Sequence, residues 1–452
     1  MGKFSDRLHA AIPGGSHTYS RGDDQYPANA PEILIRGRGA YVYDQADREY
    51  LDYGMGLRAV TLGYAEPRVN AAAIEQIGRG VNLTRPSMVE LEAAEALIDL
   101  IPGADMVKFG KNGSNVTTGA VKIARAVTGR SYVCIPRQHP FFSFDDWFIG
   151  TTPVTRGIPA GMAAHSLSFD YGDIDSLERL FAEHPGEIAC VIMEPVTLTS
   201  PCPAACSQPF TAAPRCSGCS NKKDSFLHRV RDLTRREGAL LILDEMITGF
   251  RWHLRGAQTY FDVEPDLSTF GKGMANGFAL SALVGKREFM EVGGIRRAAA
   301  ERVFLMSTTH GAEMPALGAF LATISVYKTD GVIDHMWSYG ARLFDGIDVI
   351  SRSKGLGDRF FMQGFPVSMN YVANGPDGKP SLPMRTLFAQ EMLRHGILMP
   401  WISVSLAHGE AELQRTLEAV DRALTVYAEA LENGISQYLQ GEPIKPVFRR
   451  FN

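Results

Sequence analysis

The sequence predicts an α/β protein with a mainly parallel sheet in a large domain and a second, smaller domain. In the middle of the chain, short β-rich runs alternate with amphipathic segments, a pattern typical of βαβ units. A chain of 452 residues is too long for one hydrophobic core. After about residue 320 the pattern changes to a helix, short strands and a long final helix, which predicts a smaller C-terminal α+β domain.

The individual elements follow in order along the chain. The first 55 residues, which contain IPGG and YPANAP, predict an irregular arm that leads into a hairpin around residues 41–51. Strands are expected at 189–193, 239–243 and 280–284, and helices at 115–126, 226–237 and 412–431. These elements suggest an arm and hairpin over 1–55, a large domain over 56–318 and a small domain over 319–452.

Composition and charge narrow the class of function. The apolar fraction of 45% and the charged fraction of 21% are ordinary for a globular protein. A net charge of -4 offers no basic surface for nucleic acid or an anionic membrane. The N-terminus has no apolar leader, and no uncharged run approaches the ~20 residues of a membrane span. We therefore expect a cytoplasmic protein that acts on small molecules.

A Gly-rich turn precedes one predicted helix in FGKNGSNVTTGAVKIARA. The N-terminus of a helix carries free N–H groups and a positive dipole end, which suit a phosphate. Gly113 would allow an anion to approach closely, and Ser114 and Asn115 would donate hydrogen bonds to it. The alternative is that Ser114 or Asn115 simply caps the helix.

An acid pair follows a buried strand in ALLILDEMITGFR, where Asp244 and Glu245 stand at the strand's carboxyl end. In open α/β sheets, ligands bind at that edge. The alternative is that the acid only caps a loop.

Lys272 stands between two glycines in TFGKGMANGF. A lysine enclosed by small residues loses hydration, so its amine becomes a better nucleophile for a carbonyl. The alternative is a surface lysine in a Gly-rich loop. An anion cradle, an acid and a lysine are together the three parts that pyridoxal phosphate requires: a phosphate anchor, a carboxylate for the pyridine nitrogen and an amine for a Schiff base.

Several motifs taken in order carry a family resemblance. IPGG, RGRGAYVYDQADREYLDYGMGL, KFGKNGSN with AVKIARAVTGR, VIMEP, LLILDEMITGFR, PDLSTFGKGMANGF and STTHGAE resemble the class III aminotransferases of the fold type I pyridoxal-phosphate superfamily. The chain is most similar in texture to the glutamate-1-semialdehyde aminomutase branch, from about residue 10 to about 430. The resemblance implies a seven-stranded sheet in the large domain and a homodimer with active sites at the interface.

The resemblance also assigns the main site residues. It makes Lys272 the Schiff-base lysine and later proton shuttle, and it pairs Asp244 with the pyridinium nitrogen. The phosphate would be held by Gly113, Ser114 and Asn115.

Further cofactor contacts are implied around these residues. Thr308 would reach the phosphate of the other subunit, Glu194 would line the pocket, and Met246 would pack on one ring face. The segment RQHPFFSFDDWF lacks the tyrosine that lies over the ring in the family, and Phe141 is expected in its place. Phe142 or plain core packing is the alternative. His139 in this segment is placed near the cofactor on one interpretation, but a lone histidine is more often structural.

An insertion over about residues 197–225 contains four cysteines at the spacing C-x3-C-x9-C-x2-C: Cys202, Cys206, Cys216 and Cys219. Two close pairs separated by a short loop are able to enclose a structural zinc ion in a reducing compartment. The alternatives are two disulfides or four unconnected thiols. Four thiolates would leave no open coordination position for catalysis.

The expected reaction is a ping-pong amino transfer through a Schiff base, from a small-molecule amine donor to a carbonyl acceptor. GSHTYSRGDDQYP and GLRAV resemble a subgroup of the family that is associated with glycan pathways. This resemblance favours a sugar-like or small carbonyl acceptor, with glutamate as the donor. Arg58 and Arg21 are candidates for holding an anionic substrate group. Two alternatives are an intramolecular aminomutase and a non-catalytic scaffold that keeps the fold.

Overall fold

The computed structural model describes residues 3–139, 141–202, 224–296 and 300–452. The chain forms two compact units, which we call the sheet unit (67–333 with 450–452) and the terminal unit (1–66 with 334–449). These limits differ from the sequence-based limits at residues 55 and 318. The N-terminal segment joins the C-terminal one because strand β13, Ile397–Leu398, pairs in parallel with β3, Glu49–Asp52.

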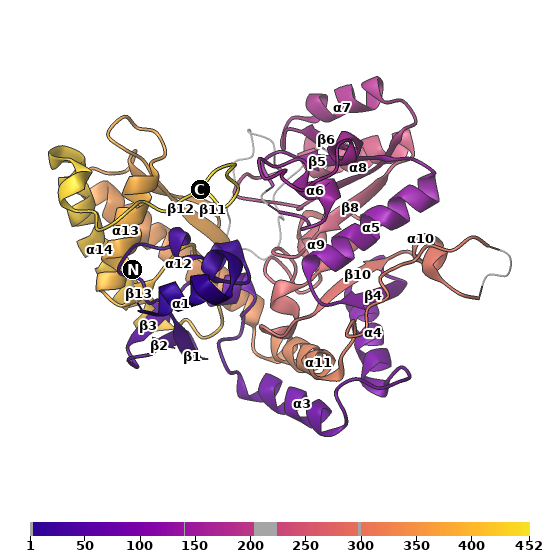
Figure 1. The fold of residues 1–452 in the computed structure, drawn as a ribbon, viewed down its shortest axis with the longest axis horizontal. Coiled ribbons are helices and arrows are strands. Elements are labelled where there is room, and N and C mark those ends of the chain that lie inside the picture. The colour runs from indigo at the N-terminus through magenta and orange to yellow at the C-terminus, as the bar shows by residue number, and fades with distance from the viewer. Residues whose placement is uncertain (1–2, 140, 203–223, 297–299) are drawn as a thin grey trace. The chain divides into compact units, whose positions relative to one another are not determined.

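The sheet unit is built on a seven-stranded sheet with the strand order β4-β10-β9-β8-β7-β5-β6 (Figure 1). Strand β10 runs antiparallel to both of its neighbours, and the other strand pairs are parallel. The strands are β4 (Met106–Gly110), β5 (Tyr132–Pro136), β6 (Ser166–Phe169), β7 (Ile188–Met193), β8 (Leu240–Asp244), β9 (Leu267–Phe270) and β10 (Ser281–Gly285). The mainly parallel sheet predicted from the sequence is confirmed.

Helices surround this sheet, so its central strands are buried along their whole length, as β7 and β8 are. The helices are α3 (Pro67–Gly78), α4 (Met88–Leu100), α5 (Gly113–Thr128), α6 (Asp146–Ile149), α7 (Ile174–Glu183), α8 (Phe226–Glu237), α9 (Ala257–Phe261), α10 (Arg287–Met290) and α11 (Met314–Thr329). Helix α8 has the predicted bounds, and α5 begins two residues before its predicted start. Throughout the described chain, every helix is too short or too polar to cross a membrane.

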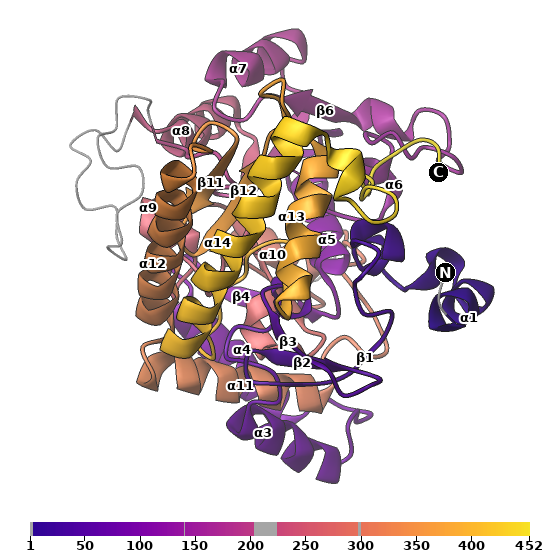
Figure 2. The ribbon, with the colours of Figure 1, turned by 90° about the vertical axis from the view of Figure 1, so that its left-hand side faces the viewer.

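The terminal unit combines two small sheets with long helices. Strands β1 (Leu34–Arg38), β2 (Tyr41–Asp44), β3 and β13 form one sheet, and β11 (Phe360–Phe365) and β12 (Ser368–Ala373) form a hairpin. Its helices are α1 (Lys3–Ala11), α2 (Met55–Arg58), α12 (Val332–Ser353), which starts two residues before the unit limit, α13 (Leu382–Arg394) and α14 (Glu410–Asn433). Helices α13 and α14 pack side by side (Figure 2). Of the four apolar residues expected on one face of α14, Leu413, Val420 and Leu424 are buried, and Leu417 is half-buried against Gly346.

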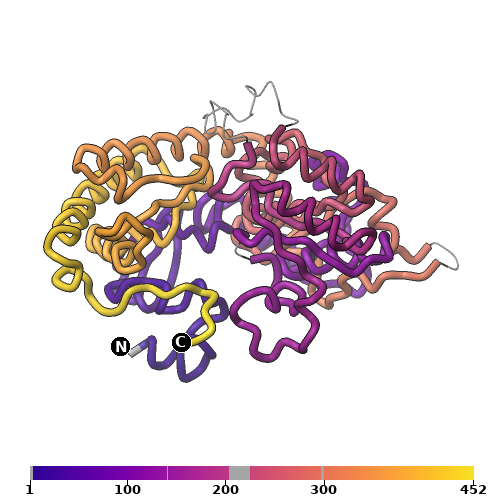
Figure 3. Tube along the Cα trace, turned by 90° about the horizontal axis from the view of Figure 1, so that it is seen from above, coloured from indigo at the N-terminus to yellow at the C-terminus, as the bar shows by residue number. Residues whose placement is uncertain are grey.

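Within the terminal unit, the last residues run beside the N-terminal arm (Figure 3). The N–H of Lys445 donates to the carbonyl of Asp24 at 2.9 Å, and the side chain of Gln25 donates to the carbonyl of Lys445 at 2.9 Å. Arg449 forms an ion pair with Asp24 at 2.6 Å. These contacts bring together two segments more than four hundred residues apart, which local sequence patterns could not show.

Candidate active site

Two adjacent strands bring an acid and a lysine to one edge of the sheet. Asp244 is the last residue of β8, and Thr269 in β9 is its partner across the ladder. Lys272 begins a 3₁₀ turn, Lys272–Ala275, two residues after β9 ends. The charge of Lys272 acts on Asp244, since it lowers the pKa of that carboxyl. The structure therefore places Asp244 and Lys272 close enough to interact electrostatically.

The Asp244 carboxyl is buried, with 2% of its surface exposed. Its Oδ1 accepts hydrogen bonds from the Met246 N–H and from the Thr269 hydroxyl, both at 3.0 Å. Burial raises the pKa of Asp244 to about 6, although the two hydrogen bonds and Lys272 act in the opposite direction. A buried carboxylate that is costly to charge is a strong partner for a cationic group placed next to it.

The turn that carries Lys272 is tightly constrained. Lys272 is half-buried and has a left-handed φ of 29°, and Asn276 at the end of the turn has φ 44°. A Cβ at Gly271 would lie 2.5 Å from the sulfur of Met246, so a larger residue before the lysine would require Met246 to move. Met246 packs closely against Gly271, the residue before Lys272, and so restricts the backbone of this turn.

The expected anion cradle lies at the N-terminus of α5. Its cap is Asn112, whose side chain accepts from the Asn115 N–H at 3.1 Å, and not Ser114 or Asn115 as the alternative interpretation supposed. The Asn115 Oδ1 accepts from the N–H of Lys111 at 3.2 Å and so closes the turn rather than pointing only at an anion. The first N–H groups of the helix, at Gly113 and Ser114, have no acceptor within the helix itself.

Ser114 completes the cradle with its hydroxyl group. The side chain is buried, and its Oγ accepts a hydrogen bond from the N–H of Phe144 at 3.0 Å. Because the oxygen is the acceptor there, its own proton is available to a phosphate oxygen.

Met246 lies between the cradle and the lysine turn. Its sulfur is 3.3 Å from where a Cβ on Gly113 would lie and 2.5 Å from where one on Gly271 would lie. Both glycines therefore leave room for the same thioether. The cradle, the buried carboxyl of Asp244, the amine of Lys272 and an apolar side chain among them fit the phosphate, ring nitrogen, aldehyde and ring face of pyridoxal phosphate.

Glu194 lies at the same edge, directly after β7, with 5% of its surface exposed. Its N–H donates to Nδ1 of His139 at 3.0 Å, and His139 follows the neighbouring strand β5. The sequence analysis left His139 with two interpretations, a position near the cofactor or a structural role, because a single histidine in a sequence carries no signal that separates a ligand contact from a core residue.

The two phenylalanines that compete for the ring face differ in exposure. Phe141 is 45% exposed and meets the ring of Phe148 edge-on at 5.7 Å. Phe142 is buried, and its carbonyl accepts from the Thr117 hydroxyl of α5 at 2.8 Å. Phe142 thus packs in the core, whereas stacking of Phe141 on the cofactor stays a prediction.

Thr308 lies in an exposed segment before α11. The N–H of Gly311 donates to its carbonyl at 3.3 Å, and Glu313 of the same segment pairs with Lys111 beside the cradle at 2.7 Å. The ion pair holds this segment near the phosphate cradle of its own chain. The reach of Thr308 to another subunit stays a prediction.

The two candidate substrate arginines belong to the terminal unit. Arg21 lines a large hollow there, together with Tyr26, Tyr64 and Trp401. Arg58 is half-buried and donates to the Ser368 hydroxyl at 3.2 Å. Their substrate contacts stay predictions.

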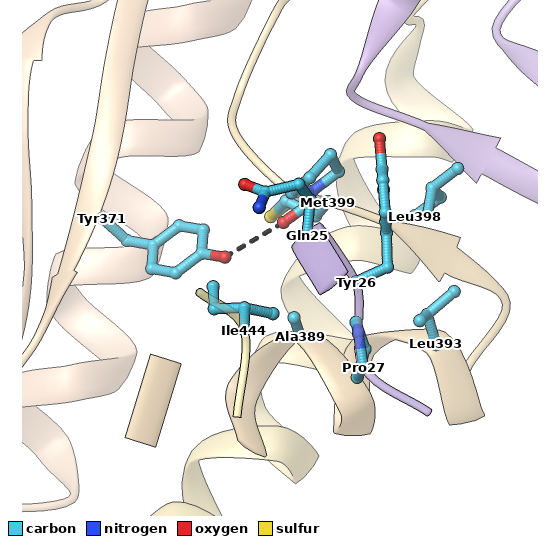
Figure 4. A pocket seen from close by; sticks show the side chains of 10 residues that line it. Gln25, Tyr26, Pro27, Tyr371, Ala389, Leu393, Leu398, Met399 and Ile444 are labelled. Carbon is cyan, nitrogen blue, oxygen red and sulfur yellow. Dashed lines mark hydrogen bonds between the residues drawn. The ribbon is translucent and has the colours of Figure 1, made fainter. Parts of the chain in front are cut away.

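A second, much smaller cavity in the terminal unit has no charged side chain on its wall (Figure 4). The Tyr371 hydroxyl donates to the carbonyl of Met399 at 3.0 Å on one side of it. Apolar side chains such as Leu393, Leu398 and Ile444 form most of the rest. Its ionisable side chains are Tyr26 and Tyr371, and burial raises the pKa of both phenols, which makes them poor bases.

The expected metal site lies mostly outside the described residues. Cys206, Cys216 and Cys219 fall in 203–223, whereas Cys202 is described and half-buried, with its N–H donating to the Ser200 hydroxyl at 3.1 Å. Within the ranges that the structure describes, His, Cys, Asp and Glu side chains form no group of three or more that could hold a metal ion. The zinc hypothesis stays a prediction.

Comparison with protein families places this edge in context. The family model described as aminotransferase class III matches residues 24–200 and 213–362. That span includes the cradle, Glu194, Asp244, Lys272 and Thr308.

Individual relatives match almost the whole chain. A glutamate-1-semialdehyde 2,1-aminomutase of Syntrophomonas wolfei is 30% identical over 442 residues, covering 92% of this chain and 96% of the relative. A 3-aminobutyryl-CoA aminotransferase of Cloacimonas acidaminovorans is 29% identical, covering 91% and 94%. The solved structure of the Sphingopyxis sp. MTA144 FumI protein in its pyridoxal-phosphate internal aldimine form superposes with a TM-score of 0.82 at 27% identity, covering 98% of both chains.

Proposed function

Because this chain belongs to the class III aminotransferases, we propose that it moves an amino group from a donor such as glutamate to a sugar-like or small carbonyl compound. The enzyme class itself, a pyridoxal-phosphate-dependent aminotransferase of fold type I, follows from the family match and the fold. The observation that carries the proposal is the buried carboxyl of Asp244 beside Lys272, at the sheet edge that also holds the phosphate cradle.

Lys272 and Asp244 would have different chemical roles. When bound, pyridoxal phosphate supplies an electron sink for the substrate carbon that carries the nitrogen. The Nζ of Lys272 would hold the cofactor in the resting enzyme and, once freed by the substrate amine, would act as the base that accepts and returns the proton of the substrate carbon. The Asp244 carboxylate would pair with the ring nitrogen and favour its protonated form.

The remaining residues at this edge of the sheet would bind the cofactor and orient it. The Gly113 and Ser114 N–H groups and the Ser114 hydroxyl would hold the phosphate at the N-terminus of α5. Met246, already in contact with both the cradle and the lysine turn, would close one face of the ring. We also propose that Glu194 lines this pocket, Phe141 covers the opposite face, and Asn115 shapes the cradle.

The substrate is the finer part of the proposal. The relatives differ in the compounds for which they are named, so neither name transfers to this chain. The hollow with Arg21 and several aromatic side chains supports a polar substrate that carries an anionic group. Arg58, which already donates to Ser368, is a second candidate for that group. The alternative is an intramolecular aminomutase, favoured by the 30% identity to an enzyme of that name.

We further propose a homodimer in which Thr308 reaches the partner's phosphate. Six large apolar side chains are exposed within a short stretch over α3, α4 and their connection: Ile74, Ile77, Val81, Leu83, Met88 and Leu91. Such a patch is larger than isolated apolar residues on a surface and is typical of an interface. Light scattering at several concentrations would show a dimer, and Thr308→Ala should weaken cofactor retention in it.

Borohydride reduction tests the enzyme part of the proposal. Reduction of the cofactor-loaded protein should attach one cofactor to the peptide that contains Lys272, as read by mass spectrometry. Lys272→Ala should abolish both the attachment and amine exchange. Lys286→Ala, which removes a surface amine paired with Glu264 at 2.9 Å, is the matched control and should change neither.

A donor and acceptor screen tests the substrate part. Separate amine donors and carbonyl acceptors should each complete one half-reaction, which is followed by the colour change of the cofactor. Turnover of a single amino-carbonyl compound without a second carbonyl would instead identify the aminomutase.

A further inference from the structure

His139 lies in a segment that the phosphate cradle holds directly. Three residues of α5 bond to this segment: the Thr117 hydroxyl donates to the carbonyl of Phe142 at 2.8 Å, the Ser114 Oγ accepts from the N–H of Phe144 at 3.0 Å, and the Thr118 hydroxyl pairs with that of Ser143 at 3.1 Å. The residues that follow His139 are therefore bonded to the helix that begins at the cradle.

The strand order places His139 on the same edge as the two acids. Strands β5, β7 and β8 are neighbours in that order, and His139, Glu194 and Asp244 stand at or just after their carboxyl ends. Parallel strands lie about 4.8 Å apart, so the three positions line one edge within reach of a single small molecule.

The imidazole of His139 has one ring nitrogen bonded and one without a partner. Only 4% of its surface is exposed, and its ring packs against Phe142 and Tyr171 with centroids 5.6 Å and 5.2 Å away. Nδ1 accepts from the Glu194 N–H at 3.0 Å. Within the described chain Nε2 is buried and has no hydrogen-bond partner.

These contacts determine the tautomer of the ring. Because Nδ1 uses its lone pair for the Glu194 N–H, a neutral ring must carry its proton on Nε2. Burial lowers the pKa of His139 to about 3, so the ring is neutral at any pH at which the enzyme would work. Nε2–H is thus a fixed hydrogen-bond donor.

A buried donor without an acceptor is uncommon in native proteins, because it has lost its bonds to water and gained none in return. At a sheet edge that binds a ligand, the missing acceptor is supplied when the ligand arrives. We propose that His139 donates a hydrogen bond from Nε2–H to the bound cofactor, which makes it a further cofactor-binding residue of this site. The inference rests on the proposed function.

Three substitutions separate this role from a structural one. His139→Gln places an amide N–H near the position of Nε2 but loses the acceptor for Glu194. His139→Asn does the reverse, since its oxygen replaces Nδ1 and its N–H falls short of Nε2. His139→Phe keeps the ring contacts and loses both polar groups. Melting temperature and circular dichroism identify any variant that does not fold.

The probe is pyridoxamine 5′-phosphate, which binds the cofactor-free full-length chain without a covalent bond to Lys272. Its affinity is measured by equilibrium dialysis. We expect His139→Asn and His139→Phe to lose about tenfold in affinity, as for one hydrogen bond, and His139→Gln to retain most of it. In the wild-type chain, the Nε2–H proton resonance should shift when the probe binds.

Two results would overturn the inference. One is equal affinity in all three variants, as expected if the donor meets a buried water. The other is that the affinities of the three variants rank in the same order as their melting temperatures, with His139→Asn binding the probe best because it alone keeps the Glu194 contact. If the wild-type chain itself fails to bind the probe, the proposed function fails as well, so the two failures are distinguishable.

Discussion

The hydroxyl of Thr269 donates a hydrogen bond to Oδ1 of Asp244 across 3.0 Å, and the two residues are partners in the ladder between β9 and β8. The strand that ends in the acid is thereby joined to the strand that leads to Lys272. A buried carboxyl would otherwise favour its neutral form, so this bond helps to keep Asp244 charged and in place.

The first prediction concerns Asp244 and pH. Burial raises its pKa in the folded protein from 3.8 to about 6, so its contribution to stability is complete below about pH 4 and is lost as the pH rises through 6. In the cofactor-free protein the cost at pH 8 is on the order of 3 kcal/mol. Asp244→Asn should therefore raise the melting temperature at pH 8 and leave it nearly unchanged at pH 4.

Glu245 leaves a residual pH dependence in that variant, because burial raises its pKa to about 7. Adding the cofactor should stabilise the wild-type protein at pH 8 more than it stabilises Asp244→Asn. An identical pH profile for the two cofactor-free proteins would show that the carboxyl is not buried as described.

The second prediction concerns the phosphate cradle. Ser114→Ala removes the hydroxyl that accepts from Phe144 and would donate to the phosphate, so cofactor affinity should fall by about tenfold. Ser87→Ala is the matched control, since Ser87 caps α4 through its hydroxyl and lies outside the cradle. It should cost about 1 kcal/mol of stability and leave affinity, read by dialysis, unchanged. Equal affinity losses in both variants would count against the cradle.

The third prediction concerns a strained turn in the terminal unit. Four consecutive residues, Met55 to Arg58, have positive φ, and Leu57 has φ 63°. The Asp52 carboxylate holds the start of this turn by accepting from the Gly54 and Met55 N–H groups at 2.6 Å and 3.0 Å. A non-glycine residue in this conformation costs about 1–2 kcal/mol.

Leu57→Gly should therefore be more stable than Leu57→Ala, by about 1 kcal/mol in denaturant unfolding. The same pair of substitutions at Leu91, an exposed position within α4, should give the opposite order, because glycine destabilises a helix by about 1 kcal/mol relative to alanine. If alanine is the more stable replacement at both positions, the left-handed turn does not exist in solution.

The fourth prediction concerns the cysteine loop. Metal analysis of the purified protein should find one zinc ion per chain, and the double change Cys216→Ser with Cys219→Ser should remove it. Amine exchange should persist, since four thiolates would leave no open position on the metal. Four thiols that titrate freely in a metal-free protein would instead support unconnected cysteines.

Local patterns were sufficient for the large-domain fold and for its chemistry. The alternation of strands and helices predicts a parallel sheet, and in such a sheet residues that follow neighbouring strands must meet at one edge. Asp244 was identified for this reason, Lys272 for its place between two glycines, and the cradle for the free N–H groups of its helix. The bounds of the large domain could not be predicted in this way. The pairing of β13 with β3 joins two segments far apart in the chain, and neither segment's local pattern indicates the other as its partner.

The sequence by itself determined which groups are present: an amine in a Gly-bounded turn, an acid at a strand end and a Gly-rich helix start. Only the tertiary structure decided what each group meets, because burial and hydrogen-bond partners come from segments far apart in the chain. It bonds the Asn115 side chain to Lys111 within the cradle, packs Phe142 in the core and, among the residues it describes, offers no acceptor to the Nε2–H of His139. The cost of desolvating a polar group depends on its whole surroundings, and no local stretch of sequence contains them.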